Sequence, residues 1–86
     1  MKRQLLLCLA IISFLSNSGF AQKAKIAAAD KKYNSYAYID AIQTYERLAE
    51  KGYQSVEMFE KLGNAYYFNS DFEKAVQSYE KLYQLQ

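Results

Sequence analysis

The chain has no histidine, no proline and no tryptophan, and only one cysteine and three glycines among its 86 residues. Without histidine, and with Cys8 inside a hydrophobic N-terminal run, it lacks the imidazole and thiolate groups used by most zinc sites and many nucleophilic sites. It also has no glycine-rich phosphate loop and no serine in a strand-turn-helix elbow. We therefore expect no catalytic residue, no metal site, no cofactor and no enzyme activity.

The N-terminus has the pattern of a secretory signal peptide. Lys2 and Arg3 form a basic start, Leu5–Leu15 is almost entirely apolar, and Gly19 and Ala21 are small residues at positions −3 and −1 of a cleavage site. At ~1.5 Å per residue this run reaches only about half of a bilayer core of ~30 Å. We predict a signal peptide at residues 1–21 and export to the periplasm or outer membrane. A buried N-terminal helix is the alternative.

Neither positive nor negative charge is in excess once residues 1–21 are set aside. Lys2 and Arg3 account for the formal net charge of +2, which leaves equal numbers of basic and acidic residues in the rest of the chain. A neutral, mixed surface exerts no long-range attraction on nucleic acid or anionic lipid. Cys8 lies in the signal segment, so the exported part needs no disulfide.

An internal repeat is the strongest pattern that the chain does contain. Sliding Tyr67–Leu82 back onto Tyr33–Leu48 aligns the two segments without a gap. The identical pairs are Tyr33/Tyr67, Ala41/Ala75, Gln43/Gln77, Tyr45/Tyr79, Glu46/Glu80 and Leu48/Leu82. Apolar residues recur at three- and four-residue steps in both copies, which predicts helices. We expect an all-α fold of two helix-turn-helix units, residues 22–55 and 56–86. A plain helical bundle with a coincidental repeat is the alternative.

Local signals place the helix ends. In the first unit we expect helices at about 23–34 and 38–51, joined by a turn at 35–37. Gly52 can adopt the left-handed conformation that ends a helix, and Ser55 can cap the next one. Asn69, Ser70 and Asp71 form the second turn, where Asp71 is the expected N-cap.

The period of the repeat and the residues at its packing positions resemble the tetratricopeptide repeat, a helix-turn-helix unit. Its pattern W-x2-L-G-x2-Y followed by A-x3-F is present as Phe59-x2-Leu62-Gly63-x2-Tyr66 and Ala75-x3-Tyr79. We expect Gly63 and Ala75 to allow close helix approach. The earlier helix of the first unit departs from the pattern with Lys25, Ala28, Ala29 and Lys32, as in a degenerate terminal repeat.

This resemblance implies a groove lined by the first helix of each unit. The groove residues would be Tyr33, Glu57, Glu60, Lys61, Asn64, Tyr67 and Phe68, with Ile26, Asp30 and Asn34 beside them. Its aromatic rings and Asn64 could bind an extended peptide or a helix. The other interpretation is that Tyr33, Tyr67 and Phe68 pack against a further repeat. The carboxylates, including Asp30 and Glu46, are spaced as solvated helix faces and not as an acid/base pair.

The segment YAYIDAIQTYERLAEKGYQSVEMFEKLGNAYYFNSDFEKAVQSYEKL, following an exported N-terminus, also resembles the start of OmpA-family cell-envelope proteins of gliding-type Gram-negative bacteria. The resemblance implies a non-enzymatic protein-binding or assembly segment in a larger protein. Leu82, Tyr83 and Leu85 would be exposed at its end and would need a cover. The alternatives are a small periplasmic protein that self-associates through this end, or an accessory domain of a downstream enzyme.

Overall fold

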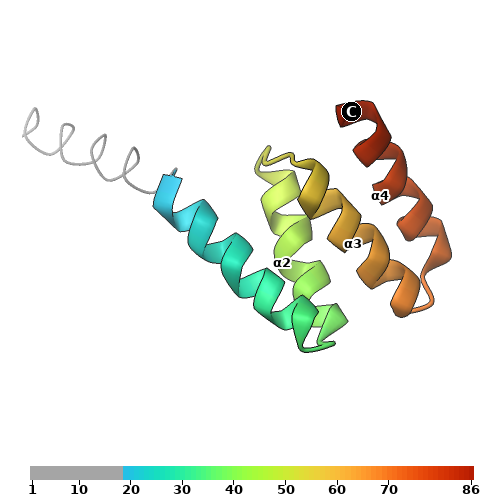
Figure 1. Cartoon of the computed structure of the whole chain (residues 1–86), viewed down its shortest axis with the longest axis horizontal. Coiled ribbons are helices and arrows are strands. Elements are labelled where there is room, and N and C mark those ends of the chain that lie inside the picture. The colour runs from blue at the N-terminus through green and yellow to red at the C-terminus, as the bar shows by residue number, and fades with distance from the viewer. Residues whose placement is uncertain (1–18) are drawn as a thin grey trace, which may run out of the picture.

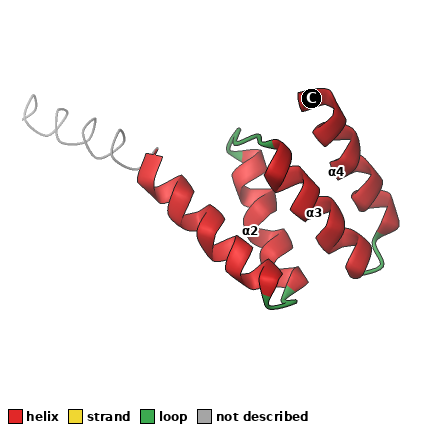
Figure 2. Cartoon of the chain, viewed as in Figure 1, coloured by secondary structure: helices red, strands yellow, loops and turns green. Residues whose placement is uncertain are grey.

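The computed structural model describes residues 19–86, which form four helices joined by short turns (Figures 1 and 2). The helices are residues 19–34, α2 (Tyr38–Glu50), α3 (Val56–Phe68) and α4 (Phe72–Leu85). No strand occurs in this part of the chain, so the predicted all-α class is confirmed. Most of the predicted signal peptide, residues 1–18, lies outside the described residues. The predicted cleavage position after Ala21 falls within the first helix.

The predicted helix-end signals are present. The Ser55 hydroxyl accepts a hydrogen bond from the backbone N–H of Met58 at 3.0 Å, and the Asp71 carboxylate accepts one from that of Lys74 at 3.3 Å. Each bond satisfies an N–H that has no partner inside its helix, which typically stabilises a helix by ~1 kcal/mol. Gly52 has a φ of 95°, the left-handed conformation expected of a glycine after a helix.

The two turns within the hairpins have the same backbone geometry, at the offset that relates Tyr33 to Tyr67 in the sequence. In residues 35–37 and 69–71, three consecutive N–H groups donate to equivalent carbonyls in the preceding helix. The central residues, Tyr36 and Ser70, have φ values of 65° and 63°. Left-handed backbone is unusual for a residue other than glycine, so residue types alone did not indicate that these turns would match.

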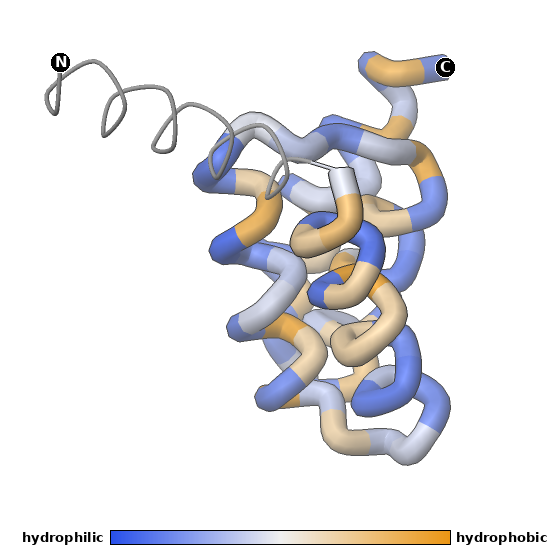
Figure 3. The backbone as a smooth tube through the Cα atoms, turned by 90° about the vertical axis from the view of Figure 1, so that its left-hand side faces the viewer, coloured by the Kyte–Doolittle hydropathy of each residue, from blue (hydrophilic) through white to orange (hydrophobic). Residues whose placement is uncertain are grey.

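Successive helices lie side by side, and α3 packs against both α2 and α4 (Figure 1). The α3 helix also contacts the helix of residues 19–34. Hydrophobic and hydrophilic residues are mixed along each helix in Figure 3, as expected where only part of each helix surface is covered. The buried apolar residues form one core, made of Ala29, Ala41, Ile42, Tyr45, Leu48, Met58, Phe59, Leu62, Ala65, Tyr66 and Ala75.

The close approach predicted at Gly63 is made to a side chain of α4. A Cβ atom built on Gly63 would lie 2.6 Å from Cε1 of Tyr79 and 2.8 Å from its Cδ1. Real Cβ atoms essentially never come this close, so the ring of Tyr79 occupies the space that any side chain at position 63 would need. Ala75, the other predicted small residue, is buried as expected.

The helical periodicity of α4 does not match its burial. Phe72 and Val76 follow the same apolar pattern as Ala75, yet they are 57% and 54% exposed. Tyr83 and Leu85 are exposed as predicted, and Leu82 is half-buried. Figure 1 shows the reason, since α4 is the last of the described helices and has α3 on one side. The apolar outer side of α4 is thus larger than the sequence suggested.

Candidate protein-binding surface

Equivalent hydrogen bonds join the two helices of each hairpin. The Tyr45 hydroxyl donates to Asp30 Oδ1 at 2.5 Å, and the Tyr79 hydroxyl donates to Asn64 Oδ1 at 2.5 Å. Donor and acceptor are displaced by the same number of positions between the two bonds, and this displacement is the period of the sequence repeat. Together with the matching turns, these bonds show that the hairpins share local geometry at that period.

Two of the predicted groove residues link α3 to the helix of residues 19–34. Lys61 Nζ lies 3.2 Å from Asp30 Oδ1, and Asn64 Nδ2 donates to the Tyr33 hydroxyl at 3.3 Å. Asn64 therefore bonds to tyrosine hydroxyls through both ends of its amide group. Lys61 and Asn64 hold the two helices in register, and part of their hydrogen-bonding capacity is used within the protein.

The remaining predicted aromatics belong to a larger cluster at the turn ends of the hairpins. Phe68 stacks on Tyr38 with ring centroids 5.2 Å apart, and Tyr67 meets Phe68 edge to face at 5.9 Å. The cluster continues from Tyr67 to Phe72 at 5.3 Å and from Tyr38 to Tyr36 at 6.2 Å. We call these five residues the aromatic row. Tyr33 contacts it through Tyr38, at 5.8 Å.

Most of the aromatic row is open to solvent. Tyr67 and Phe68 are 55% and 56% exposed, and Tyr36 and Phe72 are also exposed. Contacts with neighbouring rings hold these side chains, while one side of each stays accessible. The sequence identified Tyr67 and Phe68 but missed Tyr36, Tyr38 and Phe72. The sequence feature that could have identified these three residues is their position in or next to the two hairpin turns. Both turns lie at the same edge of the helices in Figure 1.

The two predicted glutamates are placed apart from this row. Glu57 and Glu60 are exposed on α3, Glu57 in its first turn. Glu57 borders a small hollow together with Lys61 and Asp30. Of the predicted groove residues, Tyr67 and Phe68 are therefore part of the aromatic row, and Tyr33 and Asn64 lie beside it. Glu57 lies nearer the opposite end of α3.

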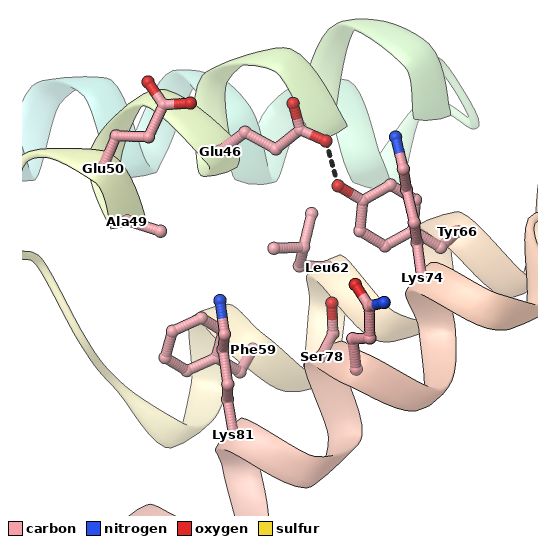
Figure 4. Close-up of a pocket in the computed structure, with 10 residues that line it drawn as sticks. Glu46, Ala49, Glu50, Phe59, Leu62, Tyr66, Lys74, Ser78 and Lys81 are labelled. Carbon is pink, nitrogen blue, oxygen red and sulfur yellow. Dashed lines mark hydrogen bonds between the residues drawn. The ribbon is translucent and has the colours of Figure 1, made fainter.

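A second hollow lies between α2 and α4, with α3 as its floor (Figure 4). Glu46 and Glu50 line it from α2. Lys74 and Lys81 line it from α4, with ammonium groups 5.8 Å and 5.7 Å from the ring centroids of Tyr66 and Phe59. Such cation–π contacts stabilise by ~0.5–1 kcal/mol at exposed sites. The hollow measures about 270 Å³, which is small for a ligand pocket of ~300–1,000 Å³.

The prediction that the carboxylates are simply solvated is wrong for Asp30 and Glu46. Asp30 accepts a hydrogen bond from Tyr45 and pairs with Lys61, while Glu46 accepts a hydrogen bond from the Tyr66 hydroxyl. Side-chain spacing along one helix could not show this, because each partner comes from another helix.

Burial raises the pKa of both Tyr45 and Tyr66 well above the usual value for tyrosine. The hydrogen bonds to Asp30 and Glu46 act in the same direction, because a hydroxyl that donates to a carboxylate is held protonated. Both hydroxyls are therefore fixed donors at neutral pH and keep α2 joined to its two neighbouring helices.

Two properties of residues 19–86 bear on the predictions. Their side chains contain no group of three metal-ligating residues placed to hold an ion. None of their helices combines the length and the apolarity that crossing a bilayer requires. Comparison of the whole chain with known protein families, curated proteins and solved structures gave no match.

Proposed function

We propose that this chain is a non-enzymatic protein-binding segment built from two tetratricopeptide-type hairpins, belonging to an exported protein of the cell envelope. The motif at Phe59–Tyr66 and the geometry that the two hairpins share support the repeat type. The signal-peptide pattern of residues 1–21 supports export. The resemblance to the start of OmpA-family proteins supports the envelope location.

The observation that carries the binding proposal is the exposure of the aromatic row. Tyr and Phe side chains offer large contact areas and have few rotatable bonds, so little conformational entropy is lost when a partner orders them. In the row, neighbouring rings already restrict these side chains. An extended peptide or a helix could lie along Tyr67 and Phe68 and reach Tyr33.

Site-specific photo-crosslinking tests this proposal in cells that produce the protein. A photoreactive phenylalanine analogue replaces Tyr67 in one variant and Gln54 in another. Gln54 is an exposed loop residue at the other end of α3, which makes it the matched control. We expect a discrete protein crosslinked from position 67, recovered with the cell envelope, and none from position 54.

An alanine substitution at Tyr67 separates the effect on binding from an effect on folding. Tyr67→Ala should keep the helical circular dichroism of the chain, because Tyr67 is more than half exposed, and should compete poorly with the unmodified protein for the crosslinked partner. Unfolding of Tyr67→Ala would place this residue in the core and contradict the proposal. Equal crosslinking from positions 67 and 54, or recovery only with cytoplasmic proteins, would also contradict it.

A further inference from the structure

The outer side of α4 corresponds, residue for residue, to the side of α2 that α3 covers. Tyr38, Ile42 and Glu46 follow one another at four-residue steps, so they share one side of α2. Tyr38 stacks on Phe68, Glu46 accepts the hydrogen bond of Tyr66, and Ile42 between them is buried. This side of α2 is thus the one that binds α3.

The repeat alignment gives the matching residues of α4. Phe72, Val76 and Glu80 have the same four-residue spacing, and Glu80 is identical to its counterpart Glu46. All three are exposed. Tyr83, the counterpart of Ala49, is 72% exposed and enlarges the same side. An aromatic ring, a branched aliphatic residue and a carboxylate therefore stand on α4 in the arrangement that holds α3 on α2.

From this correspondence we propose that the outer side of α4 binds the first helix of a further helical hairpin, in the geometry in which α2 binds α3. The proposal rests on the proposed role as a protein-binding segment. Its surface adjoins the aromatic row and shares Phe72 with it, while Val76, Glu80 and Tyr83 lie outside that row. The interface already present between α2 and α3 defines what the incoming helix must carry.

The incoming helix needs three features at fixed spacing. A hydroxyl donor such as tyrosine must face Glu80, as Tyr66 faces Glu46. An aromatic residue two positions later must stack on Phe72, as Phe68 stacks on Tyr38. Bulky apolar residues four and eight positions before the donor must be buried in the new interface, as Leu62 and Met58 are buried in the core. This pattern belongs to α3 itself.

A second copy of this chain fits these requirements less well. Its own α3 is already buried between α2 and α4. The helix of residues 19–34 has Ala28, Lys32 and Asn34 where α3 has Leu62, Tyr66 and Phe68. It therefore lacks the bulky apolar residue, the hydroxyl donor and the aromatic ring.

The test appends a copy of residues 53–86 directly after Gln86 of the full chain, so that each appended residue lies one repeat period after its counterpart. Urea unfolding is followed by circular dichroism in the original and the extended chain. We expect a higher unfolding midpoint for the extended chain, since stacked repeats stabilise one another. Val76→Asp should reduce the folded-to-unfolded ratio of the extended chain by at least about tenfold, because it places a carboxylate in the new interface.

Two controls define the site. Gln77→Asp puts the same carboxylate on the neighbouring position, whose counterpart Gln43 is exposed, and should change the ratio by less than about threefold in either chain. Val76→Asp should likewise have a small effect in the original chain. Tyr66→Phe made only in the appended copy should destabilise the extended chain by about threefold to tenfold, through loss of the hydroxyl that faces Glu80.

Equal effects of Val76→Asp in the original and extended chains would overturn the proposal. So would a stable dimer of the original chain that Val76→Asp dissociates in sedimentation, because a second copy would then be the occupant. The crosslinking experiment at Tyr67 measures partner capture in cells, and the unfolding experiment measures the interface at Val76. Failure of the crosslinking would therefore reject the proposed function without changing the outcome at Val76.

Discussion

Gly63→Ala is expected to destabilise the protein, although alanine is normally the better residue inside a helix. The new methyl group would lie 2.6 to 3.0 Å from three ring atoms of Tyr79. The ring cannot move away freely, because its hydroxyl donates to Asn64 at 2.5 Å. Either α3 and α4 separate, or the ring rotates and the hydrogen bond is lost.

The structure sets the sign and rough size of this effect. Replacing glycine by alanine inside a helix contributes ~1 kcal/mol in favour of folding. Overpacking of this kind costs ~1–3 kcal/mol, and loss of the Tyr79–Asn64 bond costs a further ~1 kcal/mol. The free energy of unfolding should therefore fall by ~1–3 kcal/mol. For a domain of this size each kcal/mol lowers the melting temperature by ~4–8 °C.

Urea unfolding monitored by circular dichroism measures the change, and a double-mutant cycle tests its cause. In a Tyr79→Ala background the clash is absent, so Gly63→Ala should become stabilising by up to ~1 kcal/mol. This change of sign is specific to contact between the two residues. The reasoning is refuted if Gly63→Ala stabilises the unmodified chain, or if its effect is the same in both backgrounds.

Two further predictions concern the tyrosine hydroxyls that donate hydrogen bonds within the protein. Tyr45→Phe should lower the free energy of unfolding by ~1–2 kcal/mol through loss of the hydrogen bond to Asp30. Tyr79→Phe should lower it by less, because Tyr79 is only partly buried. The midpoints of urea unfolding compare the two variants, and a larger loss for Tyr79→Phe would contradict this prediction. Stability should also fall at alkaline pH. Burial raises the pKa of Tyr45 and Tyr66 in the folded state, so the unfolded chain loses protons first above pH ~10, and each tyrosine removes ~1.4 kcal/mol per pH unit. Absorbance of tyrosinate should show a late-titrating group that appears together with loss of helicity; titration of all tyrosines near pH ~10 with helicity intact would contradict the assignment.

The positions of the helices follow from local signals in the sequence. Ser55 and Asp71 can satisfy helix N–H groups by themselves, and Gly52 can end a helix without help from distant residues. Such signals act within a few residues, so they can be recognised without knowing the fold. The first helix was expected from about residue 23, but it is already present at residue 19, the first described position.

The candidate surface was only partly predictable. Tyr67 and Phe68 were expected in it because of their position in the repeat, and both are exposed. Lys61 and Asn64 were expected there too, but they make contacts with the helix of residues 19–34. The aromatic row includes Tyr36, from the first turn, and Phe72, the first residue of α4. These residues join one row only when both hairpins pack side by side.

Three features could be predicted from the order of residues alone: the helical class, the ends of the helices and the correspondence between the two halves of the chain. Helix formation and capping depend on near neighbours, so no knowledge of the packing was needed. Which members of the repeating pattern are covered depends instead on how the helices pack. Val76 and Ile42 occupy equivalent positions, yet Ile42 is buried and Val76 is exposed. The reason is that α3 covers this side of α2, whereas no described helix covers the same side of α4. Burial requires a neighbouring helix, which no residue's own identity specifies.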